Sequence, residues 1–309
     1  MTILAPGIAY LDLEFLGTPR VIATAVLQGP AGAALVDPGP STSLARLEAG
    51  LAAAGTALDE VAAILVTHIH LDHAGSVGTL VRRRPLLRVW VHAKGAPHLA
   101  NPEKLLSSAA RLYGADMERL WGEVLPVPAS NLAVLGGGER IEVGGRSIEV
   151  AYTPGHAAHH VSYFVRDAGV AFVGDTAGVC VIPGGEVLPP TPPPDVDLEA
   201  WETSLAAIER WGSDTLFLTH FGPVDRVRPH LGALRENLAT ASRLVAQSLE
   251  RPGTDEDRER WFADEWRRLL RRRVGENDVQ TYEAAGRFDL SWRGLARYWR
   301  KRALARGQS

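Results

Sequence analysis

The segment VAAILVTHIHLDHAG occupies residues 61–75 and joins an apolar run to a cluster of polar side chains. Residues 61–67, VAAILVT, form a short, continuous apolar stretch of the kind found in strands that are covered on both faces. Four side chains of ligand type follow within six positions: His68, His70, Asp72 and His73. Open α/β sheets place their ligands beyond the carboxyl ends of strands. The segment therefore predicts an α/β fold with a site at the end of this strand.

These four side chains are of the types that bind transition metals. Side chains alternate along an extended segment, so His68 and His70 are expected to point the same way, while a tighter turn brings Asp72 and His73 to a second point. Packing gives no reason to concentrate three histidines and an aspartate here, because an isolated histidine is ordinarily a core or surface residue. Imidazole and carboxylate together suit zinc, manganese or iron. The cluster predicts a site for two neighbouring metal ions.

Three more apolar segments end at a histidine or an aspartate. The hairpin pattern ERIEVGGRSIEVAYTPGH delivers His156, the strand pair VSYFVRD and AFVGDT ends at Asp175, and TLFLTH ends at His220. Upstream, residues 20–37 are predicted to form two strands, and residues 43–54 a helix. Strands separated by helices, in two successive groups, favour an α/β four-layer sandwich with two central sheets and outer helices.

The pattern becomes helical after Pro229. Helices are predicted over three ranges that carry four of the eight tryptophans: 231–250, 255–273 and 291–304. We therefore divide the chain into a catalytic domain, residues 1–230, and a helical C-terminal subdomain, residues 231–309. The C-terminal aromatic helices, a helical lid candidate at 102–122 and the loop at 178–197, which includes the proline-rich run LPPTPPPDVD, are predicted to line the entrance to the site.

Composition bounds the class of protein. With 309 residues, 46% of them hydrophobic and 22% charged, the chain is typical of a globular protein. The single cysteine, Cys180, excludes an intrachain disulfide and a multi-cysteine zinc site, and it is expected to be buried and inert. The N-terminus shows no signal peptide and the chain no membrane span, so a cytoplasmic protein is expected. The net charge of −3 argues against general polyanion binding, although residues from Arg251 onward carry +5 and the rest −8.

The ordered motifs resemble those of the metallo-β-lactamase superfamily over about residues 20–222. They are LVDPG with Asp37, HIHLDH, TPGH, VGDT and LTHFG. The resemblance implies an αββα sandwich with a C-terminal helical extension. It also implies a ligand set in which one metal takes His68, His70 and His156, the other takes Asp72, His73 and His220, and Asp175 bridges the two. Asp37 is similar to the family's buried structural aspartate, which braces the ligands through hydrogen bonds.

This ligand set implies hydrolysis without a serine or cysteine nucleophile. Two divalent cations, zinc first and iron or manganese as alternatives, would ionise a shared water and polarise a substrate carbonyl. Asp72 and Asp175 are the candidate catalytic residues, because both can orient the resulting hydroxide and Asp72 can carry a proton toward the leaving group. The expected substrate is a small molecule with a thioester or carboxylic ester bond, or else a lactone.

Branches of the family differ at a few positions. Asp175 stands where some true β-lactamases have cysteine, which argues against β-lactam cleavage. The ligand set is similar to that of hydroxyacylglutathione hydrolases, but TAGVCVIPGGEVLPP departs from their glutathione-binding pattern. The ligands are also similar to those of acyl-homoserine-lactone lactonases, yet Gly178 replaces the tyrosine expected three residues after the bridging aspartate.

Two alternative functions are compatible with the motifs, and five histidines lie outside the implied ligand set. An iron-dependent oxidoreductase such as a persulfide dioxygenase is the main alternative, followed by a phosphodiesterase or nuclease. The acidic core disfavours nucleic acid as a partner, no membrane is expected, and a homo-oligomer is left open. His160 is expected to support a ligand without binding metal, and His159 is expected to be exposed. Three more histidines are expected to be ordinary surface or core residues: His92, His98 and His230.

Overall fold

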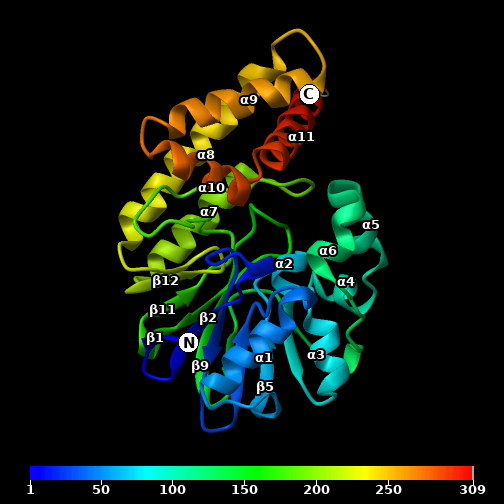
Figure 1. The fold of residues 1–309 in the computed structure, drawn as a ribbon, viewed down its shortest axis with the longest axis vertical. Helices are drawn as coiled ribbons and strands as arrows, with labels where there is room; N and C mark the ends of the chain where they lie inside the picture. The colour runs from blue at the N-terminus through cyan, green and yellow to red at the C-terminus, as the bar shows by residue number, and fades with distance from the viewer. Residues whose placement is uncertain (308–309) are drawn as a thin grey trace.

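The computed structural model describes residues 1–307, and the side chains of all of these except 277, 306 and 307. Two β-sheets lie at its centre, and helices cover their outer faces (Figure 1). The first sheet has seven strands in chain order: β1 (Thr2–Ala5), β2 (Ile8–Asp12), β3 (Ala23–Leu27), β4 (Ala33–Val36), β5 (Val61–Leu65), β6 (Arg88–His92) and β7 (Leu132–Leu135). Pairing is antiparallel from β1 to β4 and parallel from β4 to β7.

The second sheet has six strands in the order β13-β12-β11-β10-β9-β8. Its members are β8 (Arg140–Val143), β9 (Arg146–Tyr152), β10 (Val161–Val165), β11 (Val170–Phe172), β12 (Thr215–Leu218) and β13 (Gly222–Val224). All neighbours in it are antiparallel except β11 and β12, which are parallel and are joined through α7 (Leu198–Trp211). A parallel pair needs such a crossover, because a hairpin can join antiparallel strands only.

The remaining helices are α1 (Leu44–Ala53), α2 (Leu71–Ala74), α3 (Val77–Arg83), α4 (Ala96–Ala100), α5 (Glu103–Tyr113), α6 (Met117–Trp121), α8 (Val227–Leu249), α9 (Asp255–Leu270), α10 (Glu276–Gly286) and α11 (Phe288–Gly307). Short 3₁₀ turns occur at Phe15–Gly17, Ser41–Ser43, Leu58–Glu60, Gly114–Asp116, Ala129–Asn131 and Arg166–Ala168. None of the helices in the described part of the chain combines the length and the apolar character needed to cross a bilayer.

Alternation along the strands produces the four layers. On β3, Ala25 and Leu27 face the second sheet and pack with Tyr163 and Phe217, whereas Val26 between them packs on the opposite side with α1. This is the period-two pattern of a strand that is buried on both faces. The outer face of the second sheet packs against α7 and the start of α8 in a further core. The predicted αββα sandwich is therefore confirmed.

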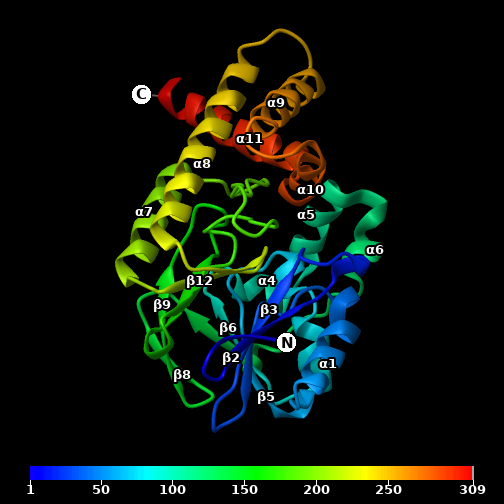
Figure 2. The same cartoon turned by 60° about the vertical axis from the view of Figure 1, so that its left-hand side comes forward.

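The C-terminal helices form their own core above the sandwich. Helices α8, α9, α10 and α11 pack together with side chains of the 178–197 loop, such as Val179 and Leu188. Helix α8 belongs to both regions, because Leu231 and Leu234 pack with α7 while Leu244 and Val245 pack with α9 and α11. Figure 2 shows α8 running from α7 up to α9 as one continuous helix. The domain boundary after residue 230 lies within this helix and stays a prediction.

The structure contains several elements that the sequence analysis did not predict, among them α3, β6, β7 and α7, and it breaks one that was predicted. The β1–β2 hairpin was not predicted, although Gly7 between the strands adopts a φ of 70° that suits a tight turn. The helix predicted at 102–122 is broken into α5 and α6 at Gly114, which has a φ of 53°. Helix α10 was not predicted, since the buried side chains on it are too few to give a clear period.

Candidate metal centre

The loop that follows β5 places four of the predicted ligands. His70 is extended and α2 begins at Leu71, so His68 and His70 precede the helix while Asp72 and His73 lie on its first turn. The ring nitrogens of His68 and His70 therefore face a common point, whereas the helical turn carries the next two side chains to a second point. This is the local geometry that the spacing predicted.

The first group consists of three imidazole rings. Nδ1 of His70 lies 3.0 Å from Nε2 of His68 and 3.0 Å from Nε2 of His156, and these two Nε2 atoms are 3.2 Å apart. In His68 and His156, the ring nitrogen that faces away from the group forms a hydrogen bond. Nδ1 of His156 donates to the carbonyl of Pro190 at 2.8 Å, and Nδ1 of His68 donates to Oγ1 of Thr67 at 3.1 Å. The Nε2 lone pairs of both rings are therefore directed into the group.

The second group consists of Asp72, His73 and His220. Nε2 of His220 lies 3.2 Å from Nε2 of His73 and 3.3 Å from Oδ2 of Asp72. Nδ1 of His220 donates to the carbonyl of Val21 at 2.6 Å, which directs Nε2 into the group. The strand β12 ends directly before Thr219, so His220 enters from the second sheet and meets the ligands of the first sheet.

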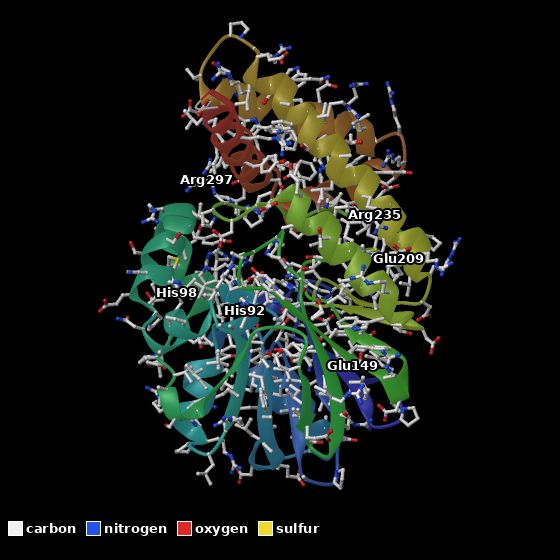
Figure 3. All side chains as sticks on the ribbon, turned by 180° about the vertical axis from the view of Figure 1, so that it is seen from behind. His92, His98, Glu149, Glu209, Arg235 and Arg297 are labelled. Atoms are coloured by element: carbon white, nitrogen blue, oxygen red, sulfur yellow. The ribbon has the colours of Figure 1, made fainter. Side chains whose placement is uncertain are left out.

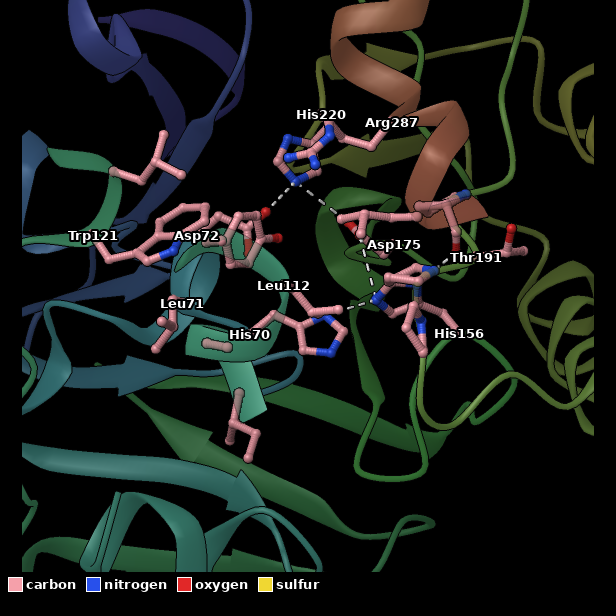
Figure 4. A pocket seen from close by; sticks show the side chains of 18 of the residues that line it. His70, Leu71, Asp72, Leu112, Trp121, His156, Asp175, Thr191, His220 and Arg287 are labelled. Carbon is pink, nitrogen blue, oxygen red and sulfur yellow. Dashed lines mark hydrogen bonds and ion pairs between the residues drawn. The ribbon is translucent and has the colours of Figure 1, made fainter. Parts of the chain in front are cut away.

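Asp175 lies between the two groups. Its Oδ2 is 3.5 Å from Nε2 of His156 in the first group, and its Oδ1 is 3.6 Å from Nε2 of His220 in the second (Figure 4). Oδ1 also lies 3.3 Å from Nε2 of His73. Oδ1 is buried and has no hydrogen-bond partner among the described residues. A buried polar atom without a partner is costly. This carboxylate oxygen therefore fits a place beside a cation.

Asp37 is buried behind the second group. Its Oδ2 accepts hydrogen bonds from Nδ1 of His73 at 2.8 Å, from Oγ1 of Thr67 at 2.7 Å and from Oγ1 of Thr219 at 2.9 Å. Its Oδ1 accepts one from the backbone N–H of Thr67 at 2.8 Å. The carboxylate thus links the loops after β5 and β12 and orients the ring of His73, as the resemblance implied.

Burial and neighbouring charges divide the histidines by pKa. Burial and the neighbouring His156 lower the pKa of His70 to about 3, and burial together with His73 and His70 holds the pKa of His68 well below its usual range. Burial also opposes a charge on His73, but Asp175 and Asp72 outweigh it and raise the pKa of His73. The first group therefore presents neutral rings at neutral pH, which is the form of imidazole that binds metals.

The donor set fits metal ions. Three combinations of ligand atoms lie within 4.8 Å of one another: His68 with His70 and His156, His68 with His73 and Asp175, and Asp72 with His73 and His220. A set of five imidazole and two carboxylate side chains suits zinc, iron or manganese. All seven predicted side chains therefore meet in one place, as candidates for holding divalent cations.

His160 contacts the site without belonging to either group, as predicted, whereas the prediction for His159 is wrong. Nε2 of His160 accepts the backbone N–H of Asp175 at 3.3 Å, and its Nδ1 contacts Oγ1 of Thr153 at 3.0 Å, so both nitrogens are engaged. His159 was expected to be exposed, which is wrong because the residue is only 9% exposed. Its Nδ1 accepts the N–H of Ile69, and its ring stacks parallel to His68, since the turn after His156 folds back against the first group.

The other singled-out side chains behave as ordinary residues. His92 is buried and stacks on Tyr152, with ring centroids 4.4 Å apart, and Nε2 of His230 donates to the carbonyl of Ala177. His98 is half-buried on α4 (Figure 3). Cys180 is buried, and burial raises the pKa of its thiol. His92, His230 and Cys180 therefore pack as predicted, whereas His98 lines the cavity beside the two groups.

A cavity of about 570 Å³ opens onto the two groups of ligands. It is lined by α5 and α6, by residues 190–195, by the α10–α11 junction and by Phe15 near the N-terminus. The predicted lid and proline-rich loop therefore do line the entrance. The C-terminal part contributes Arg287 and its neighbours, whereas Trp266 and Trp292 are buried in the C-terminal core. Sequence reasoning missed Arg287 and Phe15, for which no motif or spacing gives a signal.

The sequence model of the metallo-beta-lactamase superfamily matches residues 17–220, and the chain belongs to this superfamily. Among solved structures, the fold is similar to that of the metallo-beta-lactamase family protein TTHA1429 from Thermus thermophilus, with a TM-score of 0.73 and 24% identity over 97% of this chain and 95% of that one. It is also similar to ST1585 from Sulfolobus tokodaii, with a TM-score of 0.63 and 23% identity over 94% of this chain and 98% of that chain.

Curated relatives match over shorter segments. ST1585 from Sulfurisphaera tokodaii, described as a metallo-beta-lactamase fold-containing protein, is 30% identical over 179 residues, which cover 57% of this chain and 63% of that protein. A hydroxyacylglutathione hydrolase from a Synechococcus species is 31% identical over 154 residues, which cover 48% of this chain and 46% of that protein. The matches thus span from under half to under two thirds of these relatives.

Proposed function

We propose that this protein is a hydrolase that depends on two divalent metal ions and cleaves a thioester or carboxylic ester bond. The support comes from one observation: seven imidazole and carboxylate side chains converge in two adjoining groups, with Asp175 between them. A pair of bound cations would supply Lewis acidity and an ionised water there. Zinc is the first choice for the metal, with iron or manganese as alternatives.

The proposal assigns the ligands as follows. His68, His70 and His156 would hold one ion, Asp72, His73 and His220 the other, and Asp175 would contact both. The hydrogen bonds from His68, His73, His156 and His220 to acceptors outside the groups favour this assignment, because they fix which nitrogen of each ring is free to bind.

Asp72 is the proposed proton carrier. Its side chain is 28% exposed and lines the cavity, whereas that of Asp175 is 6% exposed. A carboxylate that touches both the site and the cavity can accept a proton and pass it to the departing thiol or alcohol. Hydrolysis needs this transfer, since water supplies an oxygen to the acyl carbon and one proton to the leaving group.

The similarity to hydroxyacylglutathione hydrolases favours a thioester, and lactones are cyclic esters within the same class of bond. The test is a hydrolysis screen on the full chain after its metal content has been measured by mass spectrometry. We expect two ions in each chain, turnover of thioesters or esters, its loss with chelator and its return with added metal. Iron together with oxygen uptake, or turnover of phosphodiesters only, would overturn the proposal.

A further inference from the structure

The cavity is apolar where it meets the ligands. Leu71, Leu112 and Trp121 lie on the side of His70 and Asp72 (Figure 4). Trp121 is 6% exposed and is held in place by Phe15, which stacks on it with ring centroids 5.8 Å apart. Removing apolar walls of this kind from water lowers the free energy of the complex. They therefore favour an apolar group of the substrate.

Helix α5 presents two different edges to the cavity. Leu105, Ala109 and Leu112 follow the i, i+4, i+7 spacing of one apolar edge. Lys104, Ser108 and Arg111 follow the same spacing one position earlier and form a polar edge. Lys104 and Arg111 are exposed, whereas Ala109 is buried. The apolar edge therefore faces the enclosed part of the cavity, and the polar edge lies at its rim.

The rim carries positive charge. Among the side chains that the structure describes, Lys104 and Arg111 pair with no carboxylate, and Nη1 of Arg111 donates only to Oγ of Ser107, at 3.3 Å. Arg287 lies across the cavity and pairs with Asp289 at 2.8 Å. Among the described side chains, Asp195 is the one carboxylate that lines the cavity apart from Asp72 and Asp175. The rim is thus net positive, although residues before Arg251 carry a formal charge of −8.

We infer that the substrate joins an apolar acyl group to an anionic leaving group, and that Lys104 and Arg111 bind the latter. This inference rests on the proposed hydrolase function. The acyl chain lies against Leu112 and Trp121, while the leaving group occupies the open rim, from which it reaches solvent. In the reaction the acyl C–S or C–O bond breaks, the oxygen of water bonds to the acyl carbon, and the leaving group departs with one proton.

The first experiment varies the charge of the leaving group alone. Octanoyl thioesters of mercaptoethanesulfonate, mercaptoethanol and thiocholine present an anion, a neutral group and a cation on thiols of similar size. The metal-loaded full chain should show kcat/KM in that order, with the anion preferred to the neutral thioester by roughly tenfold, and salt should reduce this preference. A preference for thiocholine, which would point to Asp195, or equal rates for all three, would overturn the inference.

The second experiment removes the rim charges. The double variant Lys104→Gln with Arg111→Gln should lose the roughly tenfold preference for the anion, because kcat/KM for the sulfonate thioester falls to that for the neutral thioester. Arg119→Gln is the matched control, because Arg119 is exposed on α6, pairs with Asp116 and does not line the cavity. An unchanged preference in the double variant, or an equal loss in the control, would refute the roles of Lys104 and Arg111.

The third experiment separates this inference from the proposed function. The S-octyl thioether of mercaptoethanesulfonate cannot be hydrolysed, so its affinity is measured by calorimetry without turnover. We expect it to bind the wild type several-fold more tightly than the double variant, and more tightly than the neutral S-octyl thioether of mercaptoethanol. Binding with no hydrolysis of any ester or thioester would sink the proposed function alone. Hydrolysis without these differences in affinity would sink the inference alone.

Discussion

Nδ1 of His73 donates a hydrogen bond of 2.8 Å to Oδ2 of Asp37, and both side chains are inaccessible to solvent. This contact fixes the ring of His73 so that Nε2 faces Asp175 and His220. The same carboxylate also accepts from the hydroxyls of Thr67 and Thr219, which follow the strands β5 and β12. One buried carboxylate thus couples the sandwich core to the second group of candidate ligands.

Asp37→Asn should lower both metal content and stability. The amide cannot accept from all four donors, and its NH₂ group would oppose an N–H or O–H donor in a buried place, which costs about 2 kcal/mol or more. We expect less than two ions per chain by mass spectrometry and a lower free energy of unfolding in urea. Asp59→Asn is the control, because Asp59 is 82% exposed at the surface. Two ions retained in Asp37→Asn would contradict the bracing role.

Asp72→Asn should reduce kcat by about a hundredfold or more, because a positioned proton carrier contributes at least that much. The loss should be larger for alkyl esters than for nitrophenyl esters, since a weakly basic leaving group departs without a proton. Initial rates on protein of measured metal content test this. If the variant keeps both ions and full turnover, Asp72 is not the proton carrier.

Leu112→Ala should change the preference for acyl chain length and leave the metal ions in place. Leu112 lines the cavity from α5 but is not among the ligand-type side chains of the two groups. Loss of its contact with a long acyl chain should lower kcat/KM for octanoyl thioesters by roughly tenfold, with little change for acetyl thioesters. A loss of metal from this variant would show that α5 shapes the ligands themselves.

Thr254→Ala should destabilise the C-terminal helices by about 1 kcal/mol, because it removes the N-cap of α9. The hydroxyl of Thr254 accepts the backbone N–H of Asp257 at any pH. The backbone N–H and hydroxyl of Thr254 also donate to the Asp257 carboxylate and lower its pKa, so this second part of the contribution is present at neutral pH and lost as the pH falls through the folded pKa. Urea unfolding should show a smaller difference from wild type in acid. Thr254→Ser keeps the cap and should match the wild type at every pH.

The sequence predicted which side chains converge at the candidate metal centre, because their positions depend on local rules. His68 and His70 are two residues apart in the loop after β5, and His156, Asp175 and His220 each follow a strand. The packing of the two sheets is enough to bring these residues together. The acceptors that orient the rings were beyond prediction. The carbonyls of Val21 and Pro190 bind His220 and His156 across large sequence separations, and a backbone carbonyl leaves no trace in the residue type.

Arg287 and His159 show the same limit. Arg287 adopts a φ of 40° between α10 and α11, and only the packing of the C-terminal helices above α5 places its guanidinium 5.6 Å from the ring centroid of Tyr113. His159 is hidden by a turn that folds back onto the site. Burial and pocket lining are properties of the assembled chain, so patterns within one segment do not report them.

Helix α8 imposes a strict phase on everything beyond it. Since it turns by roughly 100° per residue, one amino acid inserted near its midpoint would swing Leu244 and Val245 away from α9 and α11 while Leu231 stayed against α7. The downstream helices, and with them the guanidinium that faces the cavity, would then be carried to the wrong side. Insertions or deletions of single residues within α8 should therefore not be tolerated, whereas surface loops elsewhere can change in length at low cost.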